Sequence, residues 1–148
     1  MMNEKESEEL LLRHGIRPTA NRIMIVRAMA GAGQPLSMID LENKLLTIDK
    51  SGIYRSLVLF RQKGLVYAVE DGSGEMKYEF CRGKNEEESD RHVHFFCEQC
   101  RQTYCMEEIA IPEVNLREGF LVHSINYMVK GLCPQCVKKR AKCLKGSY

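Results

Sequence analysis

Two short segments, HVHFFCEQC (92–100) and GLCPQC (131–136), decide the fold of the second half of this 148-residue chain. Each contains a Cys-x-x-Cys pair, Cys97 with Cys100 and Cys133 with Cys136. Two such pairs can present four thiolates to one ion at about 2.3 Å, in the tetrahedral arrangement that Zn²⁺ prefers. The spacing therefore predicts a structural zinc site. Because four protein ligands leave no open coordination position, this ion is expected to stabilise the fold and not to catalyse a reaction.

A second group of potential metal ligands surrounds the first pair. His92 and His94 stand two residues apart, so in a strand both side chains point to the same face. Cys81 precedes them and Cys105 follows, and two sulfurs with two imidazoles would form a second site selective for zinc. Alternatively, the histidines lie on a hydrated strand face and the two cysteines are small buried apolar residues. Cys143 has no partner by spacing and is expected to be a free surface thiol.

The first half of the chain is expected to form helices followed by a hairpin. Apolar spacing and capping residues predict helices over 4–14 and 20–30, a third helix that Ser37 and Asp40 start, and a fourth helix over about 50–63. The third helix is expected to carry Ile39, Leu41, Leu45 and Leu46 inward. Strands at 65–70 and 75–80 flank the turn Asp71-Gly72-Ser73-Gly74. Short helices before a two-stranded hairpin are the plan of a winged helix-turn-helix, whose last helix enters the DNA major groove.

On that plan, the polar residues of the last helix face DNA. They are Ser51, Tyr54, Arg55 and Arg61. The alternative is that Tyr54 is a packing aromatic and Arg55 forms a surface ion pair.

Charge is distributed unevenly along the chain. The net charge is +2, but residues 10–64 hold nine Lys/Arg against three Asp/Glu, a local balance of +6. Residues 65–95 have a balance of −4, and residues 96–148 a balance of +3. A basic first block suggests a polyanionic partner, because neutralising phosphates releases counterions, although a solvated basic surface would look the same.

Composition limits the class of protein. No apolar run approaches the 18–20 residues that span a bilayer, and the acidic N-terminus MMNEKESEEL is unlike a secretory signal. We therefore expect a cytoplasmic protein without a membrane partner, in which the seven cysteines supply metal ligands or redox groups and do not form a disulfide framework. The expected fold is α+β, with a winged-helix DNA-binding domain (1–80), an acidic linker (81–91) and a small α/β domain that contains the four-cysteine zinc site (92–148).

This combination resembles the ferric uptake regulator (Fur) family, and within it most closely the zinc-sensing Zur branch. The resemblance extends from about Leu10 to Cys136. It is carried by GIRPTANRIMIV (15–26), SGIYRSLVLFRQKGLV (51–66) and the two cysteine segments. It implies a homodimeric, metal-dependent transcriptional repressor of operator DNA, in which a second metal at the hinge sets the spacing of the two winged helices.

The resemblance also implies roles for individual residues. Tyr54 and Arg55 match the groove-reading pair, and Arg17 matches a basic residue that approaches the minor groove or backbone. The two Cys-x-x-Cys pairs match the structural zinc ligands, and His92 with His94 match ligands of the hinge site. Cys81 falls where Zur-like members place a cysteine ligand.

Three departures from the family pattern stand out. Cys105 stands where the family usually has a glutamate ligand. Gln34 precedes Pro35 where iron-type members use a histidine. The segment Pro112–Gly119 is short for the helix of the dimerisation domain, so this helix is expected to be reduced to a turn.

Zinc is the favoured regulatory metal, because Cys81 and Cys105 are soft ligands. The alternative is an iron- or peroxide-responsive regulator, for which Glu79, at a family ligand position, would substitute as an oxygen ligand for Fe²⁺. A zinc hydrolase or deaminase needs an open coordination position and a general base, and the sequence around His92 and His94 offers no such glutamate. We therefore expect a protein that is not an enzyme. A zinc-ribbon interaction module that binds no DNA remains a further alternative.

Overall fold

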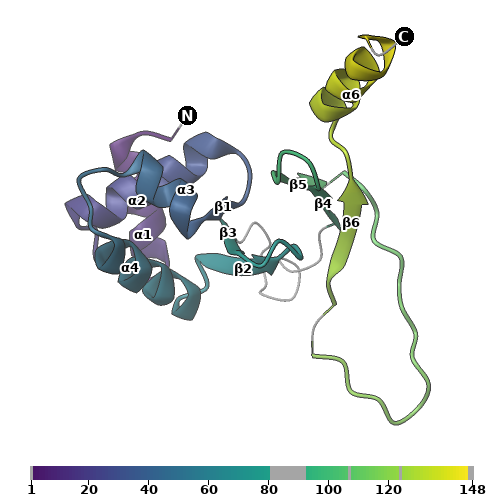
Figure 1. Cartoon of the computed structure of the whole chain (residues 1–148). Coiled ribbons are helices and arrows are strands. Elements are labelled where there is room, and N and C mark those ends of the chain that lie inside the picture. The colour runs from purple at the N-terminus through teal and green to yellow at the C-terminus, as the bar shows by residue number, and fades with distance from the viewer. Residues whose placement is uncertain (1, 81–92, 107, 124, 147–148) are drawn as a thin grey trace. The chain divides into compact units, whose positions relative to one another are not determined.

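The computed structural model describes residues 2–80, 93–106, 108–123 and 125–146, and in the last helix it describes side chains up to Ala141. The chain divides into two compact units, Met1–Asp90 and Arg91–Tyr148. The first unit contains helices and a hairpin, and the second contains a small sheet followed by one helix (Figure 1). These elements confirm the α+β fold class expected from the sequence.

Four helices build the first unit. They are α1 (Glu4–Arg13), α2 (Ala20–Ala32), α3 (Met38–Lys44) and α4 (Lys50–Gln62). The first helix begins with a capping box, in which the Asn3 side chain accepts from the Glu6 amide at 2.8 Å. Ser37 caps α3 in the same way, with its hydroxyl oxygen 3.1 Å from the Asp40 amide. Gly33 ends α2 in the left-handed conformation, with φ at 65°.

A three-stranded antiparallel sheet completes this unit. Its order is β1 (Leu36–Ser37), β3 (Met76–Phe80) and β2 (Val66–Glu70). Along the chain, the hairpin β2–β3 comes directly after α4. The register pairs Val66 with Phe80 and Glu70 with Met76. In the connecting turn, the Asp71 carboxylate accepts from the Ser73 amide at 2.9 Å. Helices followed by this hairpin form the winged helix-turn-helix that the sequence predicts.

The core of the first unit consists of aliphatic side chains from all four helices, together with Phe60 and Tyr78. Two residues of the α3 region depart from the expectation, since Ile39 is 55% exposed and Leu46 is 87% exposed. Leu46 lies outside because α3 already ends at Lys44, so the helical spacing that would turn this side chain inward is absent. Ile39 lies in the first turn of a seven-residue helix whose buried residue is Leu41.

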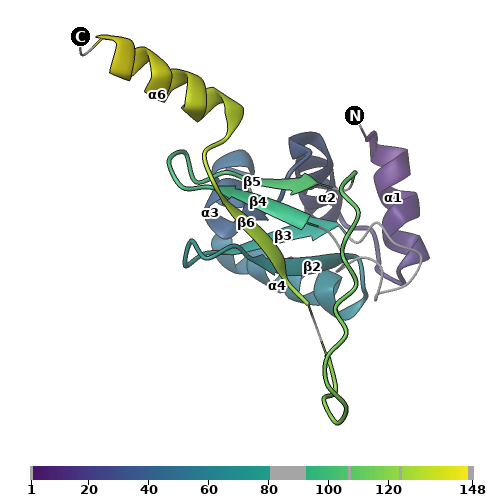
Figure 2. The ribbon, with the colours of Figure 1, turned by 90° about the vertical axis from the view of Figure 1, so that its right-hand side faces the viewer.

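The second unit is a three-stranded sheet that leads into a helix. Its strands are β4 (Val93–Cys97), β5 (Thr103–Met106) and β6 (Tyr127–Gly131), in the order β5-β4-β6. The strand β4 pairs antiparallel with β5 and parallel with β6. The helix α6 (Pro134–Gly146) starts three residues after β6 and extends away from the sheet of its own unit (Figure 2).

A long connection joins β5 to β6. Its described residues 108–123 contain no helix, only turns and extended chain. Gly119, in one of these turns, has a φ of 97°, which only glycine adopts easily. The expected reduction of the Pro112–Gly119 helix to a turn agrees with this course.

Among the helices that the structure describes, none is both long enough and apolar enough to cross a membrane.

Candidate nucleic-acid interface and metal centre

The two faces of α4 differ in chemistry. Ile53, Leu57 and Phe60 are fully buried, at the spacing of one helical stripe. The four polar residues assigned to DNA contact are all exposed, and Tyr54 exposes 54% of its surface. The exposed residues are Ser51, Tyr54, Arg55 and Arg61. The core therefore leaves this polar face of the helix available to a partner.

The first turn of α4 is held by local contacts. The Ser51 hydroxyl donates to the Asp49 carboxylate, and this hydrogen bond keeps the pKa of Asp49 below its usual range. The Arg55 Nε donates to the Ser51 carbonyl oxygen at 3.3 Å. At Gly52 a Cβ would lie 2.7 Å from the Asp49 carboxylate oxygen, so a larger residue would displace that side chain. Arg17 is exposed as well, in the segment between α1 and α2.

The two Cys-x-x-Cys pairs converge in the second unit. The sulfur atoms of Cys97, Cys100, Cys133 and Cys136 all lie within 4.8 Å of one another. The Cys100 and Cys133 sulfurs are 3.8 Å apart. Four sulfurs at about 2.3 Å from a tetrahedral Zn²⁺ would be separated by about 3.8 Å, so the cluster has the dimensions of a zinc site. Three of the four thiols are buried, and they form the centre of this unit's small core.

The environment divides the four thiols into two kinds. Burial opposes ionisation of Cys97, but backbone amides led by that of Cys133 outweigh it and lower the pKa of Cys97 to about 6. The Cys133 amide donates to Cys97 Sγ at 3.4 Å. Burial raises the pKa of Cys136 to about 12 and also raises that of Cys100. Metal binding at this cluster must therefore displace protons, because the thiolate is the ligand form.

Tyr104 contributes to this cluster, although nothing in the spacing of the cysteines indicated it. It lies opposite Phe95 in the β4–β5 pair and packs against the buried cysteines. Its hydroxyl hydrogen-bonds to the Cys133 thiolate, which, with burial, raises the pKa of Tyr104 to about 12. The signal that would have found it is its position on β5, next to the strand that ends in Cys97.

The residues assigned to the hinge site fall in different parts of the chain. His94 and Cys105 are direct partners in the antiparallel β4–β5 pair. Cys81 and His92 lie outside the described residues. In the first unit, Glu79 is buried on β3 and accepts a hydrogen bond from the Tyr67 hydroxyl.

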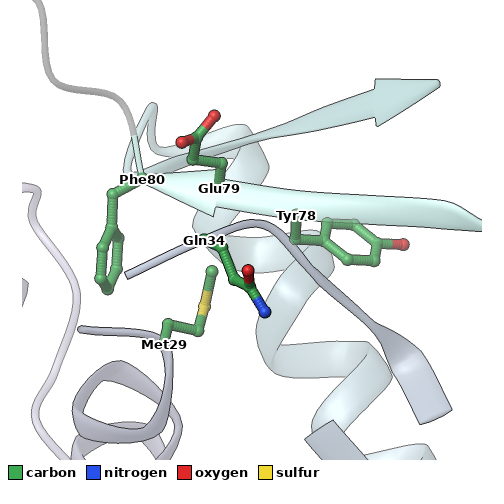
Figure 3. A pocket seen from close by; sticks show the side chains of 5 residues that line it. All are labelled: Met29, Gln34, Tyr78, Glu79 and Phe80. Atoms are coloured by element: carbon green, nitrogen blue, oxygen red, sulfur yellow. The ribbon is translucent and has the colours of Figure 1, made fainter. Parts of the chain in front are cut away.

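A small cavity adjoins Glu79 within the first unit. Its volume is about 10 Å³, and it is lined by Met29, Gln34, Tyr78, Glu79 and Phe80 (Figure 3). This is room for about one water-sized group. Gln34 thus lines the same cavity as Glu79.

The model of the "Ferric uptake regulator family" matches residues 13–130 of this sequence, which is most of the chain. The chain belongs to the ferric uptake regulator family. It is therefore a metal-responsive transcription regulator with a DNA-binding winged helix. Members of the Fur family are regulators and not enzymes.

Individual relatives are similar over nearly their whole length. The peroxide operon regulator of Bacillus subtilis (strain 168) is 26% identical over 143 residues, which cover 91% of this chain and 94% of that protein. The crystal structure of the Vibrio cholerae ferric uptake regulator aligns with a TM-score of 0.62, 17% identity, 85% of this chain and 98% of that chain. The holo structure of XcZur aligns with a TM-score of 0.58, 21% identity, 91% of this chain and 96% of that chain.

The fold expected from the Fur resemblance is thus confirmed. The roles of individual residues in DNA binding and in the hinge site remain predictions. The cysteine cluster suggests a zinc site.

Proposed function

We propose that this chain is a zinc-responsive repressor, which binds double-stranded operator DNA as a homodimer. The observation that carries the proposal is the combination of an exposed polar face on α4 with a four-sulfur cluster in a separate unit. The first supplies groups that can contact base edges, and the second supplies a metal-stabilised module. In this proposal residues 1–80 form the DNA-binding domain, residues 81–91 the hinge and residues 92–148 the dimerisation domain.

In the DNA complex, α4 enters the major groove. Tyr54 and Arg55 contact base edges, and Ser51 and Arg61 face the same groove. Arg17 approaches the minor groove or the backbone. An exposed arginine can donate two hydrogen bonds to a guanine edge, which is the commonest specific contact in the major groove. The burial of Ile53, Leu57 and Phe60 supports this docking, because it fixes which side of α4 faces outward.

Two metal sites serve different purposes. Cys97, Cys100, Cys133 and Cys136 hold a structural Zn²⁺, consistent with their 3.8 Å sulfur separation. Cys81, His92, His94 and Cys105 bind the regulatory Zn²⁺, and Glu79 substitutes where the metal prefers oxygen. The pairing of His94 with Cys105 supports this assignment, since cross-strand partners bring two ligands together. A ligand can shift a conformational equilibrium only by its different affinity for the two states, and a site complete in one state alone meets that condition.

Homodimerisation is proposed for the second unit. Its described surface exposes several large apolar side chains in one segment, including Phe120 at 62% and Leu121 at 80%. Fur-family regulators form dimers, and a second copy of this chain would cover these side chains.

The test is a metal titration of DNA binding. Metal is first removed from the protein until mass spectrometry finds about one zinc per chain. The probe is a DNA duplex that zinc-loaded protein selects from a random library. Fluorescence anisotropy should show that added Zn²⁺ raises the affinity for this duplex and leaves that for a scrambled duplex nearly unchanged. An affinity that does not respond to Zn²⁺ would exclude zinc-gated binding.

A second candidate is an iron- or peroxide-responsive regulator of the same class. The similarity to the Bacillus peroxide operon regulator and the carboxylate of Glu79 favour it, because Fe²⁺ accepts oxygen ligands. The same titration distinguishes the two. Anaerobic Fe²⁺, but not Zn²⁺, would restore binding, and in the peroxide-sensing case hydrogen peroxide would then abolish it.

A further inference from the structure

The helix α6 concentrates the positive charge of the chain. It contains five Lys/Arg residues and no Asp/Glu. The first unit, residues 1–90, holds 13 Lys/Arg and 15 Asp/Glu, a balance of −2, and residues 91–148 hold nine and five, a balance of +4. The +5 of α6 therefore exceeds the net charge of +2 of the whole chain, and the remainder without α6 carries −3.

Three of these charges lie on side chains that the structure describes, and these three are accessible. Lys138, Lys139 and Arg140 are all exposed. Within the described part of the chain, no carboxylate forms an ion pair with any of the three. The helix also extends away from the sheet of its own unit (Figure 2). A polyanion could therefore approach these side chains without displacing an internal partner.

The base of α6 is fixed to the cysteine cluster. Cys136, in the first turn, is buried and belongs to that cluster. The Val137 amide donates to the Cys133 carbonyl oxygen at 2.9 Å. The first turn of α6 is thus fixed to the cysteine cluster of the second unit. The charges that follow this turn therefore have a defined place on that unit.

Like charges on one side of a free helix repel each other. In the sequence, lysines stand at positions 138, 142 and 145, with the spacing i, i+4 and i+7. Like charges at this spacing destabilise an isolated helix. A line of phosphates would remove this repulsion, and it would release counterions when it binds.

We propose that α6 is a second DNA-contacting element, which binds the phosphate backbone without reading base sequence. This inference rests on the proposed operator binding and adds to it a contact from the second unit. The helix suits DNA better than a membrane surface, because it contains no aromatic residue and only Val137 and Leu144 as large aliphatic residues. Helices that lie in membrane interfaces carry a broader apolar face, usually with Trp, Phe or Leu.

The test removes three charges and leaves the cysteine cluster intact. The variant is Lys138→Gln/Lys139→Gln/Arg140→Gln, in the full chain. The control, Lys5→Gln/Arg117→Gln/Lys130→Gln, removes the same charge from exposed positions outside α6. Zinc content and oligomeric state are measured first and should equal those of the unchanged protein in both variants. Affinity for the selected duplex and for a scrambled duplex is then measured between about 50 and 200 mM salt, the range in which phosphate contacts dominate.

The slope of log K against log salt is negative, and each lost phosphate contact makes it less steep by about 0.9. The same loss lowers the affinity at 0.1 M salt by roughly eightfold. We expect the α6 variant to lose at least one such contact per chain, with equal loss on the two duplexes. The control should change the slope by less than half as much.

Equal slopes for the variant and the unchanged protein would overturn the proposal, as would a slope change that the control reproduces. A membrane surface would be the partner instead if the unchanged protein bound phosphatidylserine vesicles and the α6 variant did not, while the salt slope of DNA binding stayed the same in both. That result would overturn the proposal. If the unchanged protein fails to prefer the selected duplex, operator binding itself is refuted, and this result is distinct from an unaltered slope.

Discussion

Removing zinc from the cysteine cluster should unfold the second unit and spare the first. The perturbation is Cys133→Ser, which deletes one sulfur ligand and also the partner of the Tyr104 hydroxyl. In the first unit the core contains sixteen buried apolar residues. In the described part of the second unit, the buried apolar residues are Val93, Phe96 and three cysteines, and the cysteines pack against partly buried Phe95, Tyr104 and Leu132. A buried large side chain stabilises by about 1.5–3 kcal/mol, so the second unit has little apolar burial with which to fold alone.

The magnitude follows from the metal. A structural zinc contributes about 10–16 kcal/mol of apparent binding free energy, which is comparable with the total stability of an ordinary domain, about 5–15 kcal/mol. We therefore expect Cys133→Ser to lose about one zinc per chain and all protection of the β4–β6 amides in hydrogen exchange. The amides of α2 and α4 should keep theirs, because their core contains no cysteine.

The matched control is Cys143→Ser, which replaces a cysteine outside the two Cys-x-x-Cys pairs of the sequence and should retain the zinc and the exchange pattern of the unchanged protein. The reasoning would be refuted if Cys133→Ser lost its zinc and the β4–β6 amides nevertheless stayed protected. It would be refuted equally if α4 lost its protection together with β4.

Three further predictions concern DNA, the first core and the hydrogen bond at the cluster. Arg55→Ala should cost about 1–3 kcal/mol of operator binding and relax the base preference. Arg17→Ala should instead weaken binding to all duplexes alike and make the salt slope less steep by about 1. Anisotropy on single-base variants of the duplex distinguishes the two patterns. Phe60→Ala should destabilise the first unit by about 3–5 kcal/mol in urea unfolding while the zinc content stays unchanged, because the side chain is fully buried and its loss leaves a cavity. Tyr104→Phe should release zinc to a chelator faster, because the hydrogen bond that orients the Cys133 ligand is lost. It should also shift the thiolate-to-metal band of the cobalt-substituted protein to longer wavelength, since a thiolate that loses a donor becomes more electron-rich. The control is Tyr127→Phe, which removes a hydroxyl that donates to the Pro112 carbonyl oxygen at 2.7 Å. It should leave the rate of zinc release and the cobalt band unaltered.

The fold was largely predictable from local chemistry. Ser37 with Asp40 marked the start of α3, and the buried spacing of Ile53, Leu57 and Phe60 marked α4. The Asp71–Gly74 turn between two short apolar runs predicted the hairpin. Each of these signals depends on residues within a few positions of one another, which is why a single sequence sufficed.

The remaining features depend on tertiary context. The exposure of Ile39 and Leu46 could not be predicted, because a helix pattern does not specify that α3 is only seven residues long. The role of Tyr104 was missed for a similar reason. Its hydrogen bond to Cys133 joins residues far apart in the sequence, through the pairing of β5 with β4 and the parallel addition of β6. Cysteine spacing predicted which sulfurs converge, but it carries no information about the groups that hydrogen-bond to them.

The regulatory metal site is tested most directly by zinc-dependent operator affinity in two hinge variants, Cys81→Ser and His94→Ala. Each variant is first shown by mass spectrometry to retain one structural zinc per chain, and by light scattering to keep the oligomeric state of the unchanged protein. Anisotropy titrations with the selected duplex are then compared with and without added Zn²⁺. Both variants should keep the basal affinity measured without added zinc and lose the increase that Zn²⁺ produces in the unchanged protein. If both retain the full increase, the regulatory ion binds elsewhere and the proposed hinge switch is wrong.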